Sequence, residues 1–181
     1  MAEWQTLRSQ TPLRATSCGF ESHLRYHEPR GRATTRHQPF IGYPTDHLLA
    51  SFRDPTAAAR AAAALVAGGI ETGDITILRG DIGAERLDGT GRAHGPGARM
   101  RRILSFTVMD QMPDIAWHER TVRDGGLVLM IKVRGDEAKA TAISTVRNHG
   151  SHFVNYYGRF ATEDVLPWQG PEPSIPSILK R

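Results

Sequence analysis

Acid–base chemistry is the first chemistry that the side chains suggest, in a glycine-rich stretch near the middle of the chain. Residues 80–95 read GDIGAERLDGTGRAHG, with Asp88 placed six positions before His94. A histidine titrates near neutral pH, and a carboxylate partner can fix which ring nitrogen carries the proton. Asp88 and His94 could therefore act as an acid–base pair if the segment folds back on itself. The simpler interpretation is two polar side chains in a solvated loop.

The same stretch has the composition of a site for a small anion. Repeated glycines let backbone N–H groups approach a negative group, and nearby arginines suit phosphate or carboxylate. A helix that begins near Ala98 would add the partial positive charge of its N-terminus. The alternative is a flexible surface loop with solvated charges. The candidate ligand-binding residues, two of them from the last predicted strand, are Arg86, Asp88, Arg92, His94, Arg99, Tyr157 and Arg159.

The sequence predicts no cofactor and no metal site. Neither nucleotide motif, G-x-x-x-x-G-K-[ST] or G-x-G-x-x-G between a strand and a helix, occurs in it. Asp114 and His118 share a helix face at a spacing of four, but zinc needs three or four clustered ligands. With one cysteine, Cys18, the chain can form neither an internal disulfide nor a cysteine zinc site.

Aromatic and basic side chains meet at the end of the last predicted strand, from Tyr156 to Phe160. Because alternate residues of a strand face opposite sides of the sheet, one tyrosine should pack under helices and the other should face outward. An outward tyrosine beside arginines could stack a nucleic-acid base. The aromatic-glycine motif of RNA-binding sheets is absent from the third predicted strand, LVLMIKV. Structural packing or a subunit contact is therefore the favoured interpretation.

The composition indicates one compact domain with flanking segments. The chain has 181 residues, 39% of them hydrophobic and 23% charged, which is enough apolar material for a core. Its formal net charge is +4. The longest apolar run, Ala61 to Ala67, is far too short to cross a membrane. With no signal-peptide pattern at the start, a cytoplasmic protein is expected.

Local signals place the elements that would position these side chains. Asp54-Pro55 is typical of a helix start, because the aspartate can accept hydrogen bonds at the N-cap and proline fits the first helical position. Gly68-Gly69 can end that helix. Strands are predicted at 47–53, 74–80, 127–133 and 152–160, and helices at 56–67, 98–111, 114–122 and 137–148.

This order of elements predicts an α+β fold, a ferredoxin-like split β-α-β sandwich. Two β-α-β units would form four antiparallel strands with two helices on one face, and a helical insertion at about 81–124 would replace the central hairpin. The other face of the sheet would be open, so a homodimer through that face is expected. The domain would span 47–160, after a disordered or non-native tail at 1–46 and before a Pro-rich tail at 161–181.

A resemblance to a known family lies in the first part of the domain. From His47 to Ile77 the chain has a strand, an Asp-Pro-capped alanine-rich helix, Gly-Gly and a second strand. This order resembles that of the small bacterial general-stress-protein domains, which implies a fold but no catalytic residues.

We therefore expect a non-enzymatic, stress-associated or regulatory protein that binds a small anionic ligand or a partner through the insertion. Two alternatives stay open. One is a small enzyme that uses Asp88 and His94, or a sheet tyrosine, as acid and base. The other is a nucleic-acid-binding module.

Overall fold

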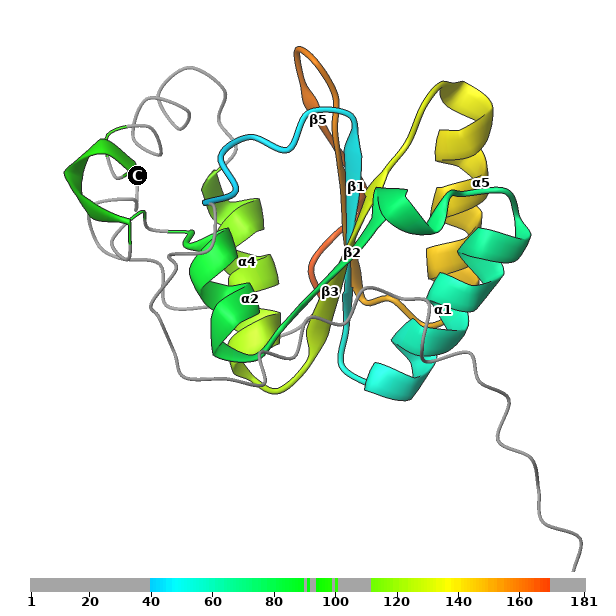
Figure 1. Ribbon diagram of the computed structural model, residues 1–181, viewed down its shortest axis with the longest axis horizontal. Coiled ribbons are helices and arrows are strands. Elements are labelled where there is room, and N and C mark those ends of the chain that lie inside the picture. The colour runs from blue at the N-terminus through cyan, green and yellow to red at the C-terminus, as the bar shows by residue number, and fades with distance from the viewer. Residues whose placement is uncertain (1–39, 90, 92–93, 99, 101–111, 170–181) are drawn as a thin grey trace, which may run out of the picture.

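A five-stranded antiparallel sheet, covered by helices on both faces, forms the centre of the molecule. The computed structural model describes residues 40–89, 91, 94–98, 100 and 112–169. Figure 1 shows the sheet close to edge-on, with α1 and α5 on one side and α2 and α4 on the other. The predicted α+β class is confirmed.

The strands lie in the spatial order β2-β3-β1-β4-β5, and each is antiparallel to its neighbours. Since β3 lies between β1 and β2, the chain passes over one strand when it runs from β1 through α1 to β2. The strands are β1 (His47–Phe52), β2 (Ile75–Arg79), β3 (Leu127–Lys132), β4 (Phe153–Tyr157) and β5 (Thr162–Leu166).

Helices α1 (Pro55–Ala67) and α5 (Asp136–Asn148) form the first helical layer. The Asp54 side chain accepts hydrogen bonds from the backbone N–H groups of Thr56 and Ala57, at 2.8 and 3.2 Å, as predicted for the N-cap. After Gly68, Gly69 takes a φ of +93° and turns the chain toward η2 (Thr72–Asp74) and β2. Alanines keep the buried side of α1 small, which allows a close approach to the sheet.

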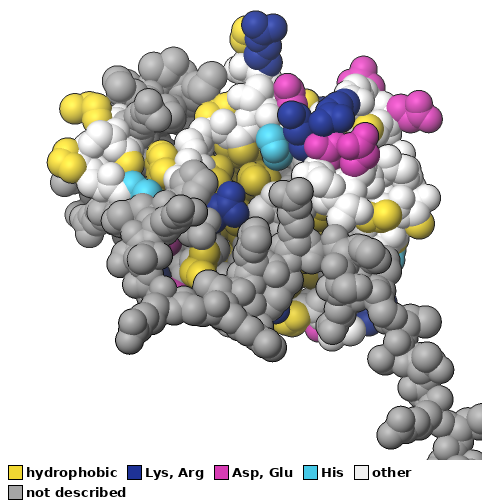
Figure 2. Space-filling view, in the orientation of Figure 1, with side chains coloured by type: hydrophobic (Ala, Val, Ile, Leu, Met, Phe, Trp, Pro, Cys, Tyr) yellow, Lys and Arg dark blue, Asp and Glu magenta, His cyan; other side chains and the backbone are white. Residues whose placement is uncertain are grey.

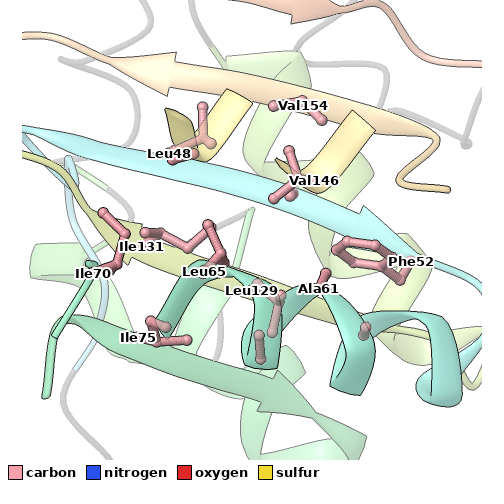
Figure 3. Close-up of a cluster of buried hydrophobic side chains, with 14 of the residues drawn as sticks. Leu48, Phe52, Ala61, Leu65, Ile70, Ile75, Leu129, Ile131, Val146 and Val154 are labelled. Atoms are coloured by element: carbon pink, nitrogen blue, oxygen red, sulfur yellow. The ribbon is translucent and has the colours of Figure 1, made fainter. Parts of the chain in front are cut away.

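The first core lies between these helices and the sheet (Figure 3). Alternate residues of β1 enter it, which is the period of two expected for a strand. Ile75 of β2 and Val154 of β4 enter it as well. Its labelled side chains are Leu48, Phe52, Ala61, Leu65, Ile70, Ile75, Leu129, Ile131, Val146 and Val154.

The second face of the sheet is covered by α2 (Gly80–Leu87) and α4 (Met112–Arg123), which corrects the expectation of an open face. Leu49 and Val128 point to this side and are fully buried. They pack with Leu87 of α2 and Val122 of α4 in a second core. The insertion is therefore part of the packing, and the premise for a homodimer through this face is wrong.

The glycine-rich stretch begins as a helix, whereas the sequence predicted a loop there. Gly80 has a φ of +57°, which lets α2 start directly after β2. A Cβ atom on Gly83 would lie 2.7 Å from the backbone carbonyl carbon of Leu78, so this glycine permits close packing of α2 on β2. The helix predicted over 98–111 lies largely outside the described residues.

Two boundaries of the domain also differ from the prediction. Residues 162–166, assigned to the Pro-rich tail, form β5 because their backbone pairs with β4. Ile41 and Tyr43, assigned to the N-terminal tail, pack against the second core. Within the described parts of the chain, no helix has the length and hydrophobicity that a membrane span requires.

Candidate functional site

Asp88 and His94 are in contact, as the acid–base hypothesis required. The distance from His94 Nδ1 to Asp88 Oδ2 is 3.0 Å, and Asp88 is 3% exposed. Asp88 follows the last residue of α2 and adopts a left-handed backbone, with φ 32° and ψ 67°. A non-glycine residue in this region stores backbone strain, and such residues gather at functional sites.

Packing against α4 holds this turn in place. The N–H of Gly89 donates to Glu119 Oε2 at 2.7 Å, and Glu119 also pairs with Arg123. A Cβ atom on Gly89 would lie 2.8 Å from Cα of Ala116, so the turn lies directly on the α4 backbone. The turn that carries Asp88 is therefore closely packed against α4, and this packing holds the Asp88 carboxylate beside His94.

The segment before β1 contacts both Arg86 and His94. The Phe40 ring lies 5.1 Å from the His94 ring, centre to centre, and the Ile41 N–H donates to the Arg86 carbonyl at 2.9 Å. Burial lowers the pKa of the Arg86 guanidinium. Its Nε atom is buried and makes no hydrogen bond in the described structure. We call Arg86, Asp88 and His94 the α2 site: Asp88 and His94 are in direct contact, and the segment at Phe40 and Ile41 contacts the His94 ring and the backbone carbonyl of Arg86.

The structure does not bring the other four predicted site residues together with the α2 site. Arg92 and Arg99 lie outside the residues whose side chains are described. Tyr157 is 1% exposed in the second core, where its ring meets that of Tyr43 edge-on at 5.6 Å. Arg159 lies on the exposed turn between β4 and β5, with its guanidinium 5.5 Å from the Phe160 ring.

The prediction of one outward tyrosine on β4 needs correction, because helices cover both faces of the sheet. Tyr157 packs in the second core, and Tyr156 packs at the margin of the first. The Lys139 ammonium lies 4.0 Å from the centre of the Tyr156 ring. Neither tyrosine therefore offers the uncovered ring face on which a nucleic-acid base would stack.

Sequence reasoning missed a second polar group, a buried network that crosses from α4 to three strands. His118 of α4 lies 2.8 Å from Ser51 Oγ through Nδ1 and 3.2 Å from Asn155 Oδ1 through Nε2. Asn155 Nδ2 in turn donates to Asp164 Oδ1 at 2.7 Å. Burial lowers the pKa of His118 to about 3, so the ring is neutral at pH 7. Since Asn155 Oδ1 is an acceptor, Nε2 carries the proton and Nδ1 accepts from the Ser51 hydroxyl.

A second carboxyl group lies one helical turn before His118. Burial, together with the charge of Asp164, raises the pKa of Asp114 to about 7. Burial removes solvation from a carboxylate, and a second carboxylate nearby repels its negative charge, so both effects raise the pKa of a carboxyl group. We call Ser51, Asp114, His118, Asn155 and Asp164 the α4 network.

Aromatic rings border the α4 network. Trp117 stacks on Trp168 with ring centres 5.9 Å apart, and Phe153 meets both rings edge-on. His152 Nε2 lies 3.3 Å from Thr121 Oγ1. Burial and the charge of Arg53 lower the pKa of His152 to about 4. The only sequence signal was the spacing of Asp114 and His118 on α4, because their partners come from distant strands.

Several arginines on the surface are paired with acidic side chains. Arg120 pairs with Asp124 and Arg134 with Asp74, at 2.8 and 3.0 Å. In the upper right of Figure 2, Lys and Arg side chains lie beside Asp and Glu side chains. Such mixed charge gives little support to a nucleic-acid surface, which needs an excess of positive potential.

Comparisons of the chain with protein-family models, with curated proteins and with solved structures found no match. Within the described ranges, no three His, Cys, Asp or Glu side chains lie close enough together to hold a metal ion.

Proposed function

We propose that the protein is a non-enzymatic regulatory protein that binds a small anionic ligand at the α2 site. The contact between Asp88 and His94 carries the proposal. A buried carboxylate that accepts from Nδ1 fixes the orientation of the imidazole. A protonated ring so held can donate to an anion.

Arg86 supports an anion as the ligand. Its guanidinium is half-buried, and the buried Nε atom lacks a hydrogen bond in the described structure. A buried donor without a partner costs free energy, and an oxygen of phosphate or carboxylate would satisfy it. The ligand would thus neutralise the positive charge of Arg86 and complete its hydrogen bonding.

A second candidate function rests on the same contact. A histidine oriented by a carboxylate also serves as a general base, as in hydrolases. The α2 site would then take a proton from a substrate hydroxyl or water, and Asp88 would stabilise the resulting imidazolium. The strained backbone of Asp88 fits either role.

Thermal unfolding of the full chain with added anions tests the first proposal. Inorganic phosphate, sulfate, citrate and ADP are suitable probes, because a ligand that binds the folded state raises the Tm by mass action. We expect a rise for the wild type that Arg86→Met and His94→Gln abolish and that Arg134→Met retains. Arg134 is the control because it pairs with Asp74, outside the α2 site. An equal rise in all four proteins, or none in the wild type, would contradict the proposal.

Hydrolysis of p-nitrophenyl acetate and p-nitrophenyl phosphate separates the two functions. The binding proposal expects no turnover above buffer. Turnover that His94→Gln and Asp88→Asn both remove would favour the enzyme.

For the fold, we propose a ferredoxin-like sandwich extended by β5. The position of β3 between β1 and β2, and of β1 between β3 and β4, supports this assignment. Membership of the general-stress-protein family and a cytoplasmic location stay predictions from the sequence.

A further inference from the structure

The segment before β1 extends from the start of that strand to the α2 site. In Figure 1 it is the blue stretch that leaves β1 and runs toward α2 and α4. The Phe40 ring lies against the His94 ring, and the Ile41 N–H donates to the Arg86 carbonyl. The Ile41 side chain also packs against the second core. We call Phe40 and Ile41 the cover of the α2 site.

The α2 site is nearly closed to solvent with the cover in this position. The His94 side chain is 12% exposed and the Asp88 side chain is 4% exposed. A phosphate or carboxylate group must reach an edge of the imidazole to accept a hydrogen bond from it. So small an exposed surface does not admit such a group, so binding at His94 requires a part of its surroundings to move.

The chain is firmly attached directly after the cover. The Tyr43 hydroxyl donates to the Gly158 carbonyl at 2.7 Å, and the Tyr43 ring meets the Tyr157 ring edge-on. The Asp46 N–H donates to the Tyr157 carbonyl at 2.7 Å. These contacts fix the chain from Tyr43 onward to the end of β4, so a movement that uncovers His94 is confined to the residues before Tyr43.

Gly42 lies between the cover and this attachment. No atom lies within 4 Å of a Cβ built at Gly42, so its surroundings leave room for a change of backbone conformation. Glycine also has a wider range of φ and ψ than any other residue. Segments that close over a site turn on a few loop residues that absorb such changes. Gly42 is therefore the position at which the cover can turn.

We propose that Phe40 and Ile41 form a lid that turns about Gly42 and controls the access of the anion to the α2 site. The inference rests on the proposed function, because it concerns the regulation of the same site. With the lid closed, Phe40 covers the His94 ring. With the lid open, the ring is exposed while Tyr43 keeps the segment attached to the sheet. Local openings of this kind cost less free energy than global unfolding.

Modification of histidines by diethyl pyrocarbonate at pH 7 measures the lid without any anion, when mass spectrometry follows each residue of the full chain. Phe40→Ala should raise the rate at His94 by roughly fivefold to tenfold, because loss of the ring contact makes the open state more populated. Phe40→Tyr keeps a ring over His94 and should react at the wild-type rate. An unchanged rate at His149, outside the site, shows that the fold is intact. A wild-type rate at His94 in Phe40→Ala would overturn the proposal.

Gly42→Ala tests the turning point. Alanine restricts the backbone of the open segment without a clash, so modification of His94 should slow by roughly twofold to fivefold. Gly73→Ala is the matched control, because a Cβ at Gly73 also meets nothing within 4 Å, and it should leave the rate unchanged. An equal effect of the two variants would contradict a lid that turns about Gly42.

Added inorganic phosphate distinguishes the lid from the ligand. A bound anion should protect His94, and the protection should be measurable in Phe40→Ala, where the site is open. Fast modification in Phe40→Ala that phosphate does not slow would support the lid and contradict the proposed function. A wild-type rate in Phe40→Ala that phosphate still slows would support the proposed function and overturn the lid.

Discussion

His118 Nδ1 accepts a hydrogen bond from Ser51 Oγ at 2.8 Å, across a fully buried boundary between α4 and β1. The two residues are 67 positions apart in the sequence. Through Asn155, the same ring joins α4 to β4 and onward to Asp164 of β5. The α4 network therefore fixes one helix of the insertion to three strands.

Removing the His118 ring should destabilise the protein, because two buried partners would lose their hydrogen bonds. For His118→Leu we expect a loss of roughly 2–4 kcal/mol in the free energy of unfolding. Ser51→Ala should cost about 1 kcal/mol, since it removes one hydrogen bond. Urea denaturation of both single variants and the double variant measures the coupling. Strictly additive effects would show that the two side chains do not interact.

Asp114→Asn should stabilise the protein increasingly as the pH rises. The pKa of Asp114 is raised to about 7 in the folded protein, so its favourable contribution is present at low pH and is lost as the pH rises from about 4 to 7. The side-chain amide of the variant cannot ionise, so the variant does not lose stability in this way as the pH rises. Urea denaturation at pH 4.5 and pH 8 should show a gain at pH 8 that shrinks at pH 4.5. Asp124→Asn, at an exposed ion pair, is the control and should show no such trend.

Two buried histidines should make the fold sensitive to acid. The pKa values of His118 and His152 are lowered to about 3 and about 4, whereas both groups take up protons near pH 6.5 in the unfolded chain. Their contribution to stability is therefore present above pH 6.5 and is lost as the pH falls toward 4. His152→Asn should flatten this loss between pH 6.5 and 4.5 relative to wild type, in guanidinium titrations. His47→Asn, on the more exposed start of β1, should leave the pH profile unchanged.

Gly89→Ala should disturb the packing of the Asp88–Gly89 turn against α4, which holds the α2 site in place. The added Cβ atom would lie 2.8 Å from Cα of Ala116, and a backbone atom cannot move aside cheaply. We expect a loss of about 1–3 kcal/mol in the free energy of unfolding, as for other overpacked sites. Gly73→Ala is the control, because nothing lies within 4 Å of a Cβ built there. Equal stability of the two variants in urea would show that α2 and α4 are not closely packed at Gly89.

Local signals were sufficient to predict the elements of the first core. Asp54-Pro55 marked the start of α1, the alanine run gave its length, and Gly68-Gly69 marked its end, all within a residue of the observed helix. These signals depend on hydrogen bonds and φ angles of neighbouring residues, so they are present in the sequence itself. The contact between Asp88 and His94 was also predictable as a hypothesis, because the two residues lie in one short segment.

Tertiary structure decided what no local pattern encodes. Leu49 and Val128 are apolar on the second face of the sheet, but their spacing does not say whether a second copy or the chain's own insertion covers them. β5 forms because β4 offers an edge to the pentapeptide TEDVL, whose last two residues also pack against the first core. Asp114 and His118 become part of a network because Ser51, Asn155 and Asp164 come from separate strands. Burial and long-range pairing depend on where the whole chain lies, which is why the sequence determined the elements and the fold determined the sites.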